Sequence, residues 1–153
     1  MKTDPRNVHA FVMGEHGDSE FVPWSQALIA TKSIVEMCEE NPMIVQRERL
    51  DQIEEEVRSA AYKIIEAKHA TYYGIGMALT RITKAILGDE QSVLTVSAML
   101  KGEFGQRDVF IGVPCIINQN GIQRVLPVKL TEEELQKLDK SCNTLRECYR
   151  GIY

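Results

Sequence analysis

The chain has 153 residues and a mass of 17.3 kDa, with 44% hydrophobic residues, 26% charged residues and a formal net charge of −4. These values are those of an ordinary folded domain, and they exclude collagen-like, low-complexity and wholly disordered chains. Because there is no basic excess, neither a nucleic acid nor a membrane surface is expected as a partner.

Targeting signals and metal-binding patterns are missing from the sequence. No run of about 18 apolar residues predicts a membrane span, and no apolar stretch of a signal peptide follows residues 1–6. The four cysteines form neither a Cys-x-x-Cys pair nor a Cys/His cluster with zinc spacing. We therefore expect a reduced, cytoplasmic protein that binds no metal and whose cysteines mostly pack in the interior.

The first part of the chain reads as extended. After a turn at Asp4-Pro5, residues 7–13 predict a strand, and the glycines in residues 14–19 break it. Residues 20–23 are compatible with a second extended segment, and residues 24–27 with a short loop or strand.

The middle of the chain reads as helical, after a break at Asn41-Pro42. Apolar residues recur every three or four positions from Leu50 onward, which predicts helix over residues 48–87. A break near residues 68–71 is expected to divide this stretch into two helices. The acidic residues 51–56 indicate a solvated helix face rather than a metal site.

The last third predicts an antiparallel meander followed by a helix. Residues 92–100, 109–117 and 122–130 read as strands, and the Asn120-Gly121 pair between the second and third predicts a hairpin turn. Thr131 and Glu134 form a capping box for a final helix ending near Tyr149, with an apolar stripe of Leu135, Leu138, Cys142 and Leu145. Residues 1–153 are thus predicted to form a single α+β domain.

His16 is the first candidate for chemistry. It lies between Gly14 and Gly17 in a Gly-Glu-His-Gly-Asp-Ser segment, where the glycines let the backbone turn sharply and let a ligand approach. An imidazole suits the transfer of one proton. Asp18 is too near in sequence to orient the ring well, so the residues alone favour a loop histidine bonded to its neighbours over a catalytic one.

Three further features are weaker candidates for a functional site. His9 follows Arg6 at three residues, so the two could hold an anion or simply lie on the surface. His69 is open to the same two interpretations. Gly74-Ile75-Gly76 resembles a dinucleotide fingerprint, but it lies in a helical pattern and is followed by Leu79 where glycine or alanine is needed. We expect these glycines to permit close helix packing instead.

These segments together resemble one family. Residues 4–20, with Pro23-Trp24-Ser25, are similar to the active-site segment of bacterial L-lactate dehydrogenases, which belong to the lactate/malate dehydrogenase family. Residues 70–75 resemble the helix start that lines the substrate pocket of these enzymes. Residues 114–122 and 126–138 resemble the C-terminal strands and helix of the family. Glu15 and Trp24 favour lactate over malate dehydrogenases.

The resemblance implies a role for four residues. His16 would donate a proton to the ketone oxygen of pyruvate during hydride transfer from NADH, and accept it in reverse. Thr71 would lie at the substrate pocket, and Ile75 near the nicotinamide ring. His9 matches the histidine that binds fructose 1,6-bisphosphate at a subunit interface in allosteric members. A homo-oligomer is implied as well, with the fold of the family's C-terminal domain.

The sequence also departs from the family. Members carry an additional N-terminal half, a Rossmann domain whose Gly-rich fingerprint holds NAD. No Rossmann domain occurs in this chain, and neither the aspartate that orients the histidine nor the arginine that binds the substrate carboxylate is present. We therefore expect the isolated chain to be inactive and to bind no NAD.

Two hypotheses about function follow. The chain is either the substrate and oligomerisation domain of an L-lactate dehydrogenase, or a non-catalytic module that associates with itself or with full-length subunits through an exposed apolar patch. Another 2-hydroxyacid dehydrogenase is a third alternative, since the specificity loop is not in this sequence.

Overall fold

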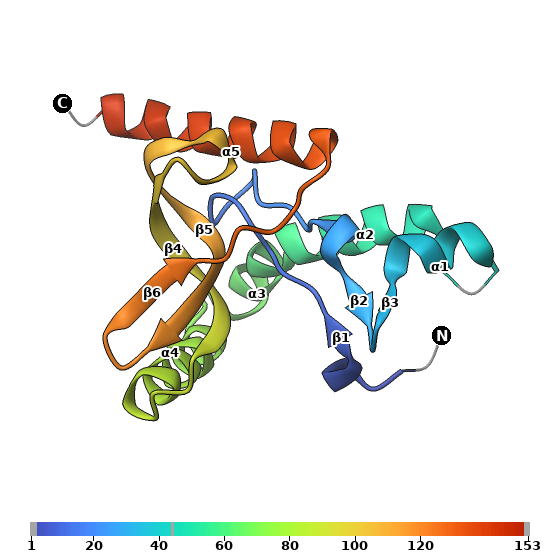
Figure 1. Ribbon diagram of the computed structural model, residues 1–153, viewed down its shortest axis with the longest axis horizontal. Helices are drawn as coiled ribbons and strands as arrows, with labels where there is room; N and C mark the ends of the chain where they lie inside the picture. Colours follow the sequence, from blue (N-terminus) through green and yellow to red (C-terminus); the bar gives the residue numbers. More distant parts are fainter. Residues whose placement is uncertain (1–2, 44, 152–153) are drawn as a thin grey trace.

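The computed structural model describes residues 3–43 and 45–151. Its helices and strands form two small antiparallel sheets with helices around them (Figure 1). In chain order, these elements are β1 (Val8–His9), β2 (Leu28–Ile29), β3 (Lys32–Ser33), α1 (Ile34–Glu40), α2 (Arg47–Arg58), α3 (Ala60–Lys68), α4 (Tyr73–Leu87), β4 (Ser92–Lys101), β5 (Arg107–Asn118), β6 (Gly121–Val125) and α5 (Glu132–Arg150). The α+β prediction is confirmed.

The larger sheet is the predicted meander, in the order β4-β5-β6. Its β5–β6 hairpin closes where Asn118 pairs with Gly121, as the Asn-Gly signature predicts. The third strand is shorter than expected, because β6 ends at Val125 and residues 126–130 are not strand. Pro127 has no N–H with which to continue the ladder, which explains the early end.

The last helix, α5, covers the larger sheet and closes the main core. The capping box of Thr131 and Glu134 is present, and the Leu138 and Cys142 side chains are fully buried against residues of β4 and β5. Leu145 is partly buried at the same core. Leu135 departs from the predicted stripe, since it is 39% exposed.

The N-terminal strand prediction is wrong in extent. Within residues 7–13, only Val8 and His9 form a strand, β1, which pairs with β2 in the small sheet. Met13 pairs instead with Phe21, through an isolated bridge. The segment therefore changes partner midway, and no continuous ladder can form. Residues 24–26 form a 3₁₀ helix rather than a loop or strand, and α1 lies in a part of the chain for which no helix was expected.

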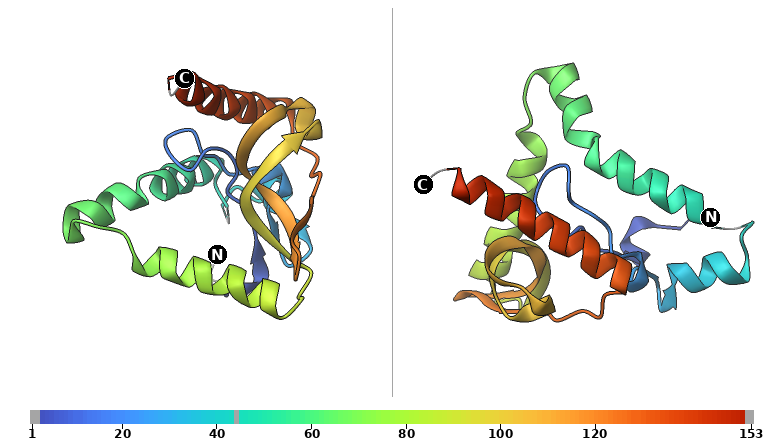
Figure 2. Two further views of the ribbon diagram at one scale, coloured as in Figure 1. Left: turned by 90° about the vertical axis from the view of Figure 1, so that its left-hand side faces the viewer. Right: turned by 90° about the horizontal axis from the view of Figure 1, so that it is seen from above.

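The long helical stretch is confirmed, together with its break. The α3 helix ends at Lys68, its C-cap residue His69 takes the left-handed backbone conformation (φ 61°), and α4 begins at Tyr73. A second interruption at Ser59 separates α2 from α3. The α2 and α3 helices lead away from the larger sheet, and α4 returns to pack its C-terminal part on β5 (Figure 2).

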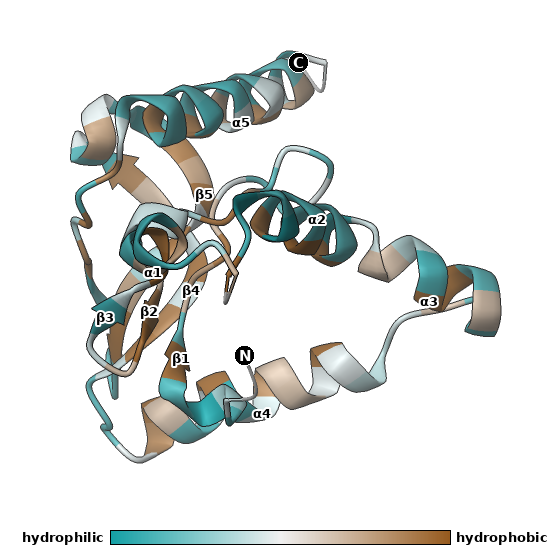
Figure 3. Ribbon diagram, turned by 90° about the vertical axis from the view of Figure 1, so that its right-hand side faces the viewer, coloured by the Kyte–Doolittle hydropathy of each residue, from teal (hydrophilic) through white to brown (hydrophobic). Residues whose placement is uncertain are grey.

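The helices α3 and α4 present an apolar surface that the chain itself does not cover. Figure 3 shows apolar stretches along both helices. A β-carbon placed at Gly74 or Gly76 would meet no atom within 4 Å, so the expected close helix packing does not occur within the described residues. The large apolar side chains exposed on these two helices are Tyr62, Ile64, Ile65, Tyr73, Ile75, Met77, Leu79 and Leu87. None of the helices in residues 3–43 and 45–151 combines the length and apolar character needed to cross a bilayer.

Candidate active site

The loop of residues 14–20, which carries His16, is closed at its base by backbone pairing. Met13 and Phe21 exchange two hydrogen bonds of 2.9 Å. The next residue, Gly14, exchanges two more with Gly112 of β5, at 2.9 and 3.0 Å. Gly14 has a φ of 107°, a conformation that side-chain-bearing residues rarely adopt. The glycine break in the sequence is therefore a tight loop fixed to the larger sheet.

Side chains hold the loop where it meets α5. The Glu15 N–H donates to Ser141 Oγ at 2.6 Å, and Ser19 Oγ donates to the Glu15 carboxylate at 2.6 Å. The two serine hydroxyls lie 3.1 Å apart. Residues on both sides of His16 are thus fixed to one another and to the last helix.

Charged residues hold the segment that leaves the loop. Arg58 of α2 donates to the carbonyl of Glu20 at 3.2 Å and to Glu54 at 3.2 Å. The buried Glu54 carboxylate also accepts from the N–H of Val22 and from Lys137 of α5. Through the buried Glu54 carboxylate, this cluster links α2 to α5 behind the loop.

The imidazole of His16 takes no part in the hydrogen bonds that hold the loop. Its side chain is 97% exposed, and its nearest acidic group is Glu20, whose Oε2 lies 3.6 Å from Nδ1. Asp18 contacts α3 rather than the ring: it accepts a 2.8 Å hydrogen bond from the Tyr62 hydroxyl. That bond and the negative charge of Asp18 raise the pKa of Tyr62. A rigid loop therefore presents an acid–base group to an open side of the domain.

The other candidate residues lie in two separate parts of the fold, and Thr71 and Ile75 both lie near the start of α4. His9 is exposed on β1, Thr71 is half-buried in the connection between α3 and α4, and Ile75 is 51% exposed on α4. Among the described residues, no hydrogen bond or ion pair joins any of these to each other or to His16. Their roles remain those implied by the resemblance.

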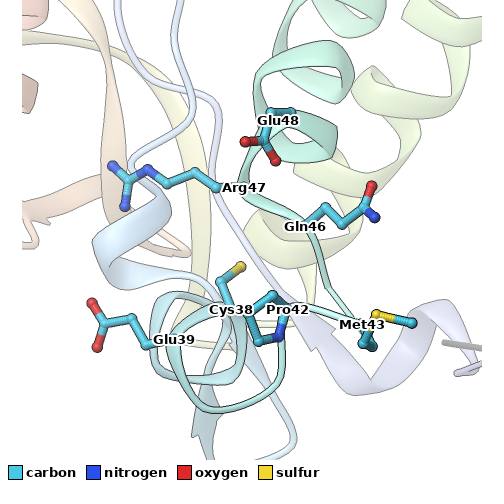
Figure 4. Close-up of a pocket in the computed structure, with 7 residues that line it drawn as sticks. All are labelled: Cys38, Glu39, Pro42, Met43, Gln46, Arg47 and Glu48. Carbon is cyan, nitrogen blue, oxygen red and sulfur yellow. The ribbon is translucent and has the colours of Figure 1, made fainter.

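Cavities and thiols do not provide a second site. A cavity of about 550 Å³ lies between the end of α1 and the start of α2, and another of about 630 Å³ lies beside the C-terminal part of α4. None of the four candidates lines either one; Figure 4 shows the first, where Cys38 lies near Pro42 and Met43. Burial raises the pKa of the Cys142 thiol to about 11, as for Cys115, so both are packing residues rather than nucleophiles. Within the described residues, no three His, Cys, Asp or Glu side chains gather as metal ligands.

Several residues of the site were not found by sequence reasoning. Gly112, Ser141, Glu54 and Tyr62 each contact the His16 loop or its flanks from a distant part of the chain. None lies in a local motif. The one available signal was Gly112, a glycine inside a predicted strand, which often marks a close backbone approach.

Comparisons with known proteins agree on one family. The family model described as lactate/malate dehydrogenase, alpha/beta C-terminal domain, matches residues 1–150. The chain is 50% identical over 147 residues to L-lactate dehydrogenase 2 of Bacillus anthracis, covering 96% of this chain and 46% of that protein. It is 51% identical over 143 residues to L-lactate dehydrogenase 1 of Bacillus cereus (strain ATCC 10987 / NRS 248), covering 94% of this chain and 45% of that protein.

A solved structure points to the same family. The minor L-lactate dehydrogenase of Enterococcus mundtii, in its ligands-bound form, superposes with a TM-score of 0.93 at 42% identity, covering 99% of this chain and 48% of that chain. The present chain spans about half the length of the curated relatives it matches, between 45% and 46% of each of the two Bacillus proteins.

Proposed function

Because this chain belongs to the lactate/malate dehydrogenase family, as its C-terminal α/β domain, we propose that it forms the substrate-binding half of an NAD-dependent L-lactate dehydrogenase. The reaction is the reduction of pyruvate to L-lactate. His16 donates a proton to the ketone oxygen in that direction and accepts one from the lactate hydroxyl in reverse. NADH supplies the hydride.

The observation that carries this proposal is the way the loop holds His16. Proton transfer requires a group whose backbone is held in place and whose side chain is open to substrate. The loop is anchored to β5, α2 and α5, yet the imidazole is 97% exposed. A histidine with a purely structural role would be expected to bury its ring or to satisfy both nitrogens within the domain.

The remaining candidates take the roles that the resemblance implies. Thr71 and Ile75 flank the start of α4, so we assign Thr71 to the pyruvate pocket and Ile75 to the side of the nicotinamide. His9, exposed on β1, is assigned to a fructose 1,6-bisphosphate site completed by other residues. The described residues offer no cradle for the dinucleotide itself: Gly74 and Gly76 lie inside the α4 helix, not at a strand–helix turn.

The isolated chain is proposed to be inactive for that reason. Binding of NAD and of the substrate carboxylate would come from an N-terminal half like that of the matched relatives. The exposed apolar side chains of α3 and α4 fit a surface that such a half, or another subunit, would cover. The same surface favours the second candidate function, a non-catalytic module that associates with itself.

Two finer assignments complete the proposal. The four cysteines are free, in keeping with a reducing cytoplasm. The resemblance at Glu15 and Trp24 favours a lactate over a malate dehydrogenase, and another 2-hydroxyacid dehydrogenase is the alternative.

Complementation tests the proposal. The N-terminal half of a matched Bacillus enzyme is added to this chain, and pyruvate-dependent oxidation of NADH is followed with fructose 1,6-bisphosphate present. We expect no turnover from either part alone and turnover from the mixture. A chain that forms a stable oligomer, and that restores no activity either mixed or fused with that half, would favour the self-associating module.

A further inference from the structure

Ser141 is a buried polar residue whose partners all lie in the His16 loop. Its side chain is fully shielded from solvent in the middle of α5. Its hydroxyl oxygen accepts the Glu15 N–H at 2.6 Å and lies 3.1 Å from the hydroxyl of Ser19. The loop and α5 lie side by side in both views of Figure 2. A helix face that packs on an apolar core normally carries apolar residues, so packing alone does not explain a serine at this position.

The direction of each hydrogen bond follows from the chemistry. An amide N–H can only donate, so Ser141 accepts from Glu15. The Glu15 carboxylate can only accept when ionised, so Ser19, at 2.6 Å, donates to it. The proton of Ser141 is then free to be donated to Ser19. The result is a closed ring that runs from the Glu15 amide through both serines to the Glu15 side chain.

We propose that Ser141 is a positioning residue for the proton-transferring His16. The ring fixes the backbone and side chain of Glu15, directly before His16, and fixes Ser19, three residues after it. The exposed imidazole has no orienting contact closer than the 3.6 Å approach of Glu20. Its position is therefore set by the loop backbone, which Ser141 holds from outside. This inference rests on the proposed function of His16.

The space around Ser141 limits what can replace it. A β-carbon at Gly14 would lie 2.8 Å from the Ser141 oxygen, so the loop packs directly against this side chain. Alanine fits the space but removes both the acceptor for Glu15 and the donor to Ser19. The Ser141→Ala variant therefore removes the attachment of the loop to α5 without crowding the loop. Ser19→Ala is a second, milder variant, because it removes the middle of the ring and leaves the Glu15–Ser141 bond.

The experiment uses this chain fused behind the N-terminal half of a matched Bacillus enzyme, assayed with pyruvate and NADH. We expect Ser141→Ala to lower kcat about 100-fold, the size of effect that a misplacement of about 1 Å produces. The KM for pyruvate should change little, because substrate binding itself is untouched. Thr144→Ala is the matched control: this α5 hydroxyl donates only within its helix, to Lys140 O at 3.1 Å. The kcat of Ser19→Ala should lie between those of Ser141→Ala and Thr144→Ala.

A double variant separates positioning from general damage. If Ser141 acts through the imidazole, Ser141→Ala should cost nothing further in a His16→Ala background, to within about twofold. A kcat of Ser141→Ala within about twofold of Thr144→Ala, or a further large loss in the His16→Ala background, would overturn the inference.

The outcomes distinguish this inference from the function beneath it. Full activity of His16→Ala would overturn the proposed function. If kcat is lost in His16→Ala but unchanged in Ser141→Ala, the proposed function stands and only the role of Ser141 is rejected. Hydrogen exchange of the Glu15 amide in the 153-residue chain decides the contact itself: we expect faster exchange in Ser141→Ala, and an unchanged rate would contradict the ring.

Discussion

The pairing of Gly14 with Gly112 makes a sharp prediction about stability. The two backbones lie so close that a β-carbon at Gly112 would lie 2.8 Å from the Gly14 carbonyl oxygen. Real β-carbons do not approach backbone atoms this closely, so Gly112→Ala must push the loop away from β5 or deform the strand. Both residues are buried or nearly so, which leaves little room for relaxation.

The magnitude follows from the contacts that are lost. Two hydrogen bonds between Gly14 and Gly112 are weakened, each worth about 1 kcal/mol, and overpacking of a well-filled interior adds about 2 kcal/mol. The lower backbone entropy of alanine in the unfolded chain returns less than about 1 kcal/mol. We expect the free energy of unfolding to fall by about 3 kcal/mol, measured by urea denaturation of the 153-residue chain.

Gly76→Ala is the matched control for this prediction. It makes the same chemical change in the first turn of α4, where the added carbon meets no atom within 4 Å. Alanine should stabilise that helix by up to about 1 kcal/mol. The two substitutions are thus predicted to change the free energy of unfolding in opposite directions. If Gly112→Ala is as stable as the original chain, the close approach of the loop to β5 is wrong.

Three further substitutions follow from the same structure. Leu138→Ala removes a fully buried side chain of the main core and should lower the free energy of unfolding by about 3 kcal/mol in urea. Burial alone would raise the pKa of Glu134, but hydrogen bonds from Ser25 and Thr131 outweigh it and lower the pKa. Its contribution to stability is therefore complete at neutral pH and is lost as pH falls below about 4.3, the usual glutamate value. Glu134→Gln should cost about 2 kcal/mol at about pH 7 and flatten the acid limb of a stability–pH curve, whereas an unchanged limb would contradict the assignment. His69→Gly should stabilise the chain by about 0.5 kcal/mol, because it relieves the positive φ at the end of α3. The melting temperature should therefore rise slightly, and a lower melting temperature would count against that strain.

The parts of the fold that sequence reasoning predicted correctly are set by local signals. The hairpin at Asn118 and Gly121 and the capping box at Thr131 each depend on residues within a few positions of one another. The same is true of the break before α4, where His69 ends one helix.

The parts it missed depend on contacts between distant residues. The strand expected over residues 7–13 fails because its two ends pair with different partners. Gly112 and Ser141 hold the His16 loop from β5 and α5, far along the chain, and no periodicity in the sequence indicates such contacts. The sequence predicted close helix packing at the glycines of α4, but no local pattern says what covers its exposed apolar residues.

The central claim is that His16 moves the proton in lactate dehydrogenation, and one comparison tests it most directly. The fused enzyme is prepared with His16→Asn and, separately, with His69→Asn, which tolerates the left-handed backbone at that position. We expect the first to lower kcat for pyruvate reduction at least about 100-fold and the second to leave it within about twofold of the unmodified enzyme. Equal kcat values for the two variants would contradict the claim.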